Sequence, residues 1–113
     1  MHLIFYTNLF IPARFHAYTV GPIILIRPTH KSNVGLVQHE LTHVKQFYRN
    51  PLFGIWYLVS QTARLKYEAE AYREQLKYYS TDKTDEFANL LVNNYKLNIT
   101  YEQAVNALSQ HEN

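Results

Sequence analysis

The chain has 113 residues, a formal net charge of +2 and no cysteine. This length allows one small domain with one modest core, and the lack of cysteine excludes disulfides and thiolate metal ligands. The low, scattered charge is not typical of a nucleic-acid-binding surface. The longest apolar runs are far shorter than the roughly 20 residues needed to span a bilayer, and the first residues lack the basic leader of a secretory signal. We therefore expect a cytoplasmic protein with no nucleic-acid partner and no membrane insertion.

Residues 1–31 have the pattern of short strands separated by turns. Gly21-Pro22 predicts a turn, Pro28 ends the last apolar run, and Ser32-Asn33 is a helix start signal. We expect a small, mostly antiparallel three-stranded sheet, which needs a helix against one face to be stable. The predicted strands are LIFYT (3–7), HAYTV (16–20) and IILIR (23–27).

The rest of the chain has helical periodicity. A helix is predicted over 33–50, where Asn50-Pro51 ends it because the residue before proline avoids the helical region. A second long helix is predicted over 52–79, and two further helices over 85–110, the last one starting at a Thr100–Gln103 capping box. The sequence thus predicts a single α+β domain, 1–113. The apolar stripe of the first helix comprises Val34, Val37, Leu41, Val44 and Tyr48.

The first predicted helix contains the sequence HELTH (39–43). Positions i and i+4 share one face of a helix, so the imidazoles of His39 and His43 can reach one Zn²⁺ ion. Glu40 is rotated by about 100° from His39. Its carboxylate can therefore reach a water on the metal without binding the metal, which is the position of a general base in hydrolysis. This HExxH pattern predicts a zinc-dependent hydrolase.

A catalytic zinc ion commonly has three protein ligands and one open position. The second predicted helix offers three glutamates in KYEAEAYRE (66–74). Glu68 lies beside the apolar stripe of that helix, whereas Glu70 and Glu74 lie on its solvated face. We expect the helix to fold back antiparallel to the first and predict Glu68 as the third ligand, with Glu70 as the alternative.

Together, HELTH, a spacer of about two dozen residues and EAEAY (68–72) resemble the gluzincin metallopeptidases, and most closely the minigluzincins. Those are small stand-alone domains similar to the catalytic cores of integral-membrane metallopeptidases. In the membrane enzymes the motif of the third ligand is Glu-x-x-Ala-Asp. Glu68-Ala69-Glu70-Ala71 matches its first four positions, and Tyr72 replaces the aspartate, which leaves support of the histidines by a hydrogen-bonded neighbour open.

The resemblance implies a sheet lying over both the zinc helix and the glutamate helix, and a peptide or protein as substrate. It also implies that an edge strand above the cleft pairs with the extended substrate. IILIR (23–27) is the natural candidate for this strand, although an ordinary buried strand would have the same pattern.

A peptidase also needs a hydrogen-bond donor for the oxyanion of its tetrahedral intermediate. Tyr72, one turn after Glu68, is the first candidate, and Tyr67 and His30 are weaker ones. A tyrosine on an apolar stripe is commonly a packed core residue, so both roles stay open for Tyr72. His2 and His16, like His30, have no ligand spacing.

Three other functions are compatible with the sequence. The tail SQHEN (109–113) could place His111 in the cleft and make the enzyme latent. The domain could hold the metal as a non-catalytic interaction module. Finally, HELTH could be coincidental in a small interaction domain whose helices over 85–110 contact a partner. The sequence does not indicate an oligomeric state.

Overall fold

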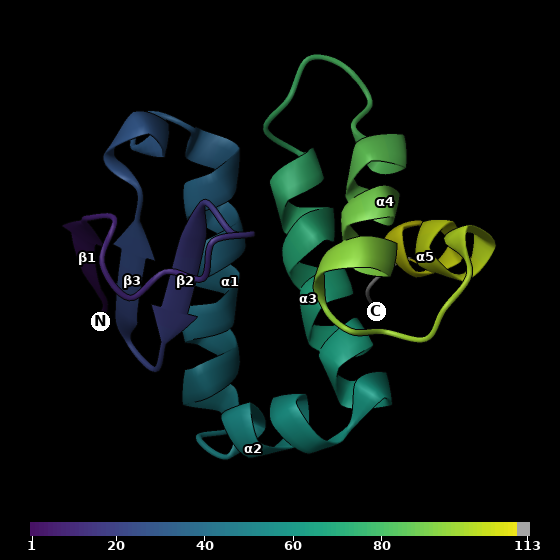
Figure 1. Cartoon of the computed structure of the whole chain (residues 1–113), viewed down its shortest axis with the longest axis horizontal. Coiled ribbons are helices and arrows are strands. Elements are labelled where there is room, and N and C mark those ends of the chain that lie inside the picture. The colour runs from purple at the N-terminus through teal and green to yellow at the C-terminus, as the bar shows by residue number, and fades with distance from the viewer. Residues whose placement is uncertain (111–113) are drawn as a thin grey trace.

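A computed structural model describes residues 1–110 of the chain (Figure 1). The described residues contain a three-stranded sheet and five α-helices, which confirms the predicted α+β class. The sheet lies at one side of the molecule, and the last three helices lie at the other. The elements are β1 (Leu3–Tyr6), β2 (Ala17–Val20), β3 (Ile23–Ile26), a 3₁₀ turn (Pro28–His30), α1 (Val34–Arg49), α2 (Phe53–Val59), α3 (Gln61–Leu76), α4 (Thr84–Asn94) and α5 (Tyr101–Leu108).

The sheet is mixed, with the strand order β1-β3-β2. β2 and β3 form an antiparallel hairpin whose turn contains Gly21 at φ +58°, a conformation that glycine adopts without strain. β1 pairs with β3 in parallel, so the expectation of a mostly antiparallel sheet is wrong for one of the two pairings. The IILIR segment is also the central strand rather than an edge strand. Its Ile24 and Ile26 side chains are completely buried, and a strand with paired backbone groups on both sides cannot accept a substrate strand.

The helix predicted over 52–79 is divided in two at Ser60. Ser60 has extended backbone angles, ends α2, and accepts a hydrogen bond from the backbone N–H of Ala63 as the N-cap of α3. A serine hydroxyl at this position satisfies one of the unpaired N–H groups of the first helical turn. As a consequence, α2 forms a short connection at one end of the molecule, and α3 returns antiparallel to α1 (Figure 1).

The described residues form one hydrophobic cluster between the sheet and α1 and another between α3 and the last two helices. The smaller cluster packs the sheet on α1 and includes Ile24, Ile26 and Val44. The larger cluster joins α3 to α4, α5 and the intervening loop, and includes Phe87 and Leu91. The main contacts of α3 are with the other helices. The expectation that the sheet lies over both the zinc helix and the glutamate helix is therefore not confirmed for α3.

The predicted capping box at Thr100 is confirmed, because its hydroxyl accepts from Gln103 N–H and the Gln103 side chain accepts from Thr100 N–H. Over residues 1–110, none of the helices combines the length and the apolar composition that crossing a bilayer requires.

Candidate metal and catalytic site

The HELTH segment lies in the middle of α1, where His39 and His43 contact Glu68 of α3. Asn33 caps this helix by accepting a hydrogen bond from the backbone N–H of Leu36. His39, Glu40 and His43 are all buried, with at most 7% of their surface exposed. Of the predicted apolar stripe, Val44 is buried, whereas Val34 and Tyr48, at the two ends, are more than half exposed. Burial of three ionisable side chains within five residues of one helix is unusual unless they are paired or bind an ion.

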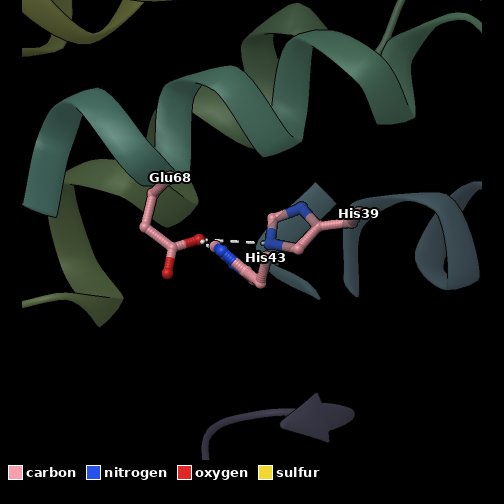
Figure 2. Close-up of side chains that lie close together, drawn as sticks. All are labelled: His39, His43 and Glu68. Atoms are coloured by element: carbon pink, nitrogen blue, oxygen red, sulfur yellow. Dashed lines mark hydrogen bonds and ion pairs between the residues drawn. The ribbon is translucent and has the colours of Figure 1, made fainter. Parts of the chain in front are cut away.

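Glu68 of α3 points at the two imidazoles (Figure 2). Its Oε1 atom lies 3.1 Å from Nε2 of His39 and 3.1 Å from Nε2 of His43. One ligand atom from each of the three side chains lies within 4.8 Å of the others. Bonds of 2.0–2.1 Å in a tetrahedral arrangement place neighbouring ligand atoms about 3.3 Å apart. The three side chains therefore form a buried group that could hold a metal ion.

The charges in this group are strongly coupled. Burial by itself lowers the pKa of His43, but the neighbouring Glu68 carboxylate outweighs burial and raises this pKa to about 9. Burial by itself raises the pKa of Glu68, but the His43 and His39 rings hold it well below its usual value. Glu68 is thus a carboxylate at neutral pH. In the metal-free chain, a proton on His43 compensates its charge.

Gln46 fixes the orientation of His43. The Nδ1–H group of His43 donates to Gln46 Oε1 at 2.8 Å, which leaves Nε2 directed at Glu68. The Gln46 amide in turn donates to the Tyr67 carbonyl and to Glu70 Oε1. Hydrogen bonds of this kind set the tautomer of a metal-binding histidine. Gln46 is 1% exposed, and its role was not predicted from the sequence.

Glu70, the alternative third ligand, is directed elsewhere. Its carboxylate accepts hydrogen bonds from Gln46 and from the Arg49 guanidinium, and it is not part of the buried His39–His43–Glu68 group. Burial by itself raises the pKa of Glu70, but the hydrogen bonds from Arg49 and Gln46 lower it. The structure therefore brings Glu68, and not Glu70, to the imidazoles.

The Tyr72 ring packs against His39, and its hydroxyl is directed at Tyr95 rather than at Glu40 or Glu68. The two ring centres are 4.3 Å apart in an edge-on arrangement, and the Tyr72 hydroxyl is hydrogen-bonded to the Tyr95 hydroxyl at 2.7 Å. His39 Nδ1 is buried and has no hydrogen-bond partner in the described part of the chain. At the position where the membrane enzymes have an aspartate, this chain thus supplies an aromatic contact to the histidine.

The two weaker donor candidates are also directed elsewhere. The Tyr67 ring packs edge-on against Phe53, and His30 stacks on His16 with ring centres 4.0 Å apart. Neither Tyr67 nor His30 lines the cavity at the site. His111 lies outside the described residues.

The hydroxyl closest to Glu68 belongs to Tyr57 of α2, a residue that the sequence did not single out. It donates to Glu68 Oε2 at 2.7 Å, and burial together with the adjacent carboxylate raises the pKa of Tyr57 well above its usual value. The serine at position 60 was the available signal, because a serine before a helical run predicts a new helix start. A helix break at Ser60 changes the direction of α2, and therefore the direction of Tyr57.

Glu40 is held by the sheet. The Thr19 hydroxyl of β2 donates to Glu40 Oε1 at 2.7 Å, and Glu40 Oε2 lies 3.8 Å from His39 Nε2. The Glu40 carboxylate thus faces the metal-binding group without sharing the Glu68 contacts. A threonine at the edge of the sheet was not recognisable as a site residue from the sequence, because its contact with α1 depends on how the sheet packs.

A cavity of about 420 Å³ opens at this site. Residues of the edge strand β2 with Gly21 and residues of α2 line it. His39, Glu40, His43 and Glu68 also line it, and most of the other lining side chains are apolar. This combination of an apolar cleft and a few converging polar groups is typical of a ligand-binding site.

Comparisons with protein-family models, curated proteins and solved structures find no match to this chain.

Proposed function

We propose that the chain is a zinc-dependent metallopeptidase of the gluzincin type, in which His39, His43 and Glu68 bind the metal. The observation that carries the proposal is the convergence of these three buried side chains, with Nε2–Oε1 separations of 3.1 Å. Two imidazoles and one carboxylate are a ligand set that suits Zn²⁺ and leaves one position open. A divalent cation would also balance the buried Glu68 charge in place of the proton that His43 otherwise holds.

When bound, Zn²⁺ would acidify a water molecule and polarise the carbonyl group of the substrate. Glu40 accepts the proton of the attacking water and then gives it to the leaving amine. The Thr19 hydroxyl holds the Glu40 carboxylate in one orientation. Gln46 keeps the His43 tautomer that exposes Nε2, and Tyr57 fixes the second oxygen of Glu68. These contacts hold the polar groups in place before a substrate arrives.

The free edge of β2 supports an extended peptide as the substrate. Within residues 1–110, β2 pairs with β3 on one side only, and its residues line the cavity that contains Glu40. A peptide that adds to this edge would form main-chain hydrogen bonds and place alternate side chains in the cavity. In this proposal β2, and not IILIR, is the strand that pairs with the substrate.

Metal analysis of purified protein tests the ligand set. We expect one zinc ion per chain in the native protein and loss of zinc in His43→Ala and Glu68→Ala. Glu74→Ala is the matched control, since Glu74 lies on the same helix and its carboxylate pairs with Lys77. Stoichiometric zinc in Glu68→Ala would contradict the proposed ligand set.

Cleavage of a mixed pool of unstructured peptides, followed by mass spectrometry, tests the reaction. Glu40→Gln should retain zinc but lose cleavage, because the amide cannot accept the proton of the water. A native chain that binds one zinc ion and cleaves none of the peptides would instead support the non-catalytic metal-binding module.

A further inference from the structure

One face of α2 is apolar, exposed and separate from the cavity. Leu52, just before the helix, Trp56 and Val59 are spaced by four and three residues, so they lie on one side of the helix. Their exposed fractions are 58%, 51% and 72%. None of the three lines the cavity at the candidate site, whereas Ile55 and Leu58 of the same helix do. The proposed peptidase function therefore leaves this face unexplained.

The sequence that flanks α2 has charges of one sign. Residues 50–63 contain no charged side chain, and the wider segment from Lys45 to Lys66 contains four bases and no Asp or Glu. Lys45 and Lys66 are exposed. The Arg64 guanidinium lies 5.7 Å from the centre of the Tyr57 ring on α2. Arg49 is 60% exposed at its side chain while it pairs with Glu70.

We propose that α2 docks on the surface of an anionic lipid bilayer, with Leu52, Trp56 and Val59 entering the interface. A short apolar helix with a tryptophan and basic neighbours has the chemistry of an interfacial helix, because apolar burial and attraction to anionic headgroups act together. α2 also lies at one end of the molecule, where the chain turns from α1 to α3 (Figure 1). The chain then lies on the membrane without spanning it.

The size of the face favours a lipid surface over a second copy of the chain. A stable protein interface buries about 800 Å² on each partner, and three partly exposed side chains on a helix of two turns provide much less. A bilayer requires no matching protein surface, and its anionic headgroups complement the basic residues on both sides of α2. The proposal does not depend on zinc or on peptide cleavage.

Trp56 is the only tryptophan of the chain, so its fluorescence reports on this face directly. We would titrate the full chain with vesicles of phosphatidylcholine alone and with vesicles containing phosphatidylserine. The expected result is a blue shift of the emission and co-sedimentation with the anionic vesicles. Arg49 already pairs with Glu70, so we count the other three bases, Lys45, Arg64 and Lys66. These should make that binding on the order of a hundredfold tighter than binding to neutral vesicles at low salt.

The double variant Leu52→Ser/Val59→Ser keeps Trp56 as the reporter and should weaken vesicle binding at least tenfold, with an unchanged far-UV circular dichroism spectrum. The matched control is Leu9→Ser/Phe10→Asn, which removes two exposed apolar side chains near the start of the chain, outside α2. Asparagine suits position 10, where φ is +64°. This control should bind vesicles like the native chain.

Three outcomes would overturn the proposal. The first is the absence of both the blue shift and co-sedimentation. The second is equal binding to neutral and anionic vesicles. The third is a concentration-dependent dimer that shifts the Trp56 emission without lipid, which would assign the face to a second copy of the chain.

Discussion

Replacing Gln46 by methionine tests whether this side chain controls the metal-binding group. Gln46 is buried and makes three hydrogen bonds, to His43 Nδ1–H, the Tyr67 carbonyl and Glu70. Methionine has a similar shape and removes all three bonds, which leaves the His43 Nδ1–H group buried without an acceptor. An unsatisfied buried polar group costs about 1–3 kcal/mol, so we expect the metal-free variant to lose stability by about this amount.

The same substitution should reduce zinc affinity. The His43 ring can then rotate or change its tautomer, and the loss of such a supporting hydrogen bond typically weakens metal binding by about 10–100-fold. Competition titrations against a chromophoric zinc chelator measure the affinity, and urea unfolding in the presence of a chelator measures the stability of the metal-free chain.

Gln38→Met is the matched control. Gln38 lies on the same helix and is half-buried, and its backbone carbonyl, rather than its side chain, accepts a hydrogen bond from Thr42. The control should have nearly native zinc affinity. Equal zinc affinity of Gln46→Met, Gln38→Met and the native chain would refute the reasoning that Gln46 positions His43.

Three further results are expected. The metal-free chain should lose stability as pH rises from 6.5 through 9, since the pKa of His43 is raised from 6.5 to about 9. It should also lose stability as pH falls below 4.5, since the pKa of Glu68 is lowered. Urea unfolding with a chelator measures the free energy of unfolding across this range, and a flat pH profile would show that the pair is not coupled. Tyr57→Phe removes a hydrogen bond to the Glu68 carboxylate and should lower the free energy of unfolding by about 1.5–3 kcal/mol; an unchanged midpoint of urea unfolding would argue against this contact. Thr19→Val should leave zinc content unchanged but reduce peptide cleavage, because Glu40 loses the hydroxyl that orients it; loss of zinc instead would show that Thr19 supports the metal ligands.

Local patterns were sufficient to predict most of the elements. The three apolar runs, the glycine–proline turn and the caps at Asn33 and Thr100 all depend on residues close together in the sequence, and the structure has elements at each of them. The break at Ser60 was missed because the apolar periodicity continues through it. A single N-cap hydroxyl is a weak signal beside such a pattern.

Strand order and pairing could not be read from the sequence. β3 lies between β1 and β2, and this arrangement depends on which backbone edges meet after the chain folds. The complete burial of Ile24 and Ile26 is the physical reason that IILIR is the central strand, because the most apolar strand gains most from neighbours on both sides.

For the candidate site too, some features follow from local sequence and others only from the packing of separate elements. The sequence by itself determined that His39 and His43 share one helix face with Glu40 beside them, and helical phase selected Glu68 over Glu70, because the 3.6-residue period of a helix fixes the relative directions of its side chains. Only the tertiary structure decided that Thr19, Gln46 and Tyr57 contact these side chains. The physical reason is that hydrogen bonds between separate elements depend on how the sheet, α1, α2 and α3 pack on one another, which no local spacing encodes.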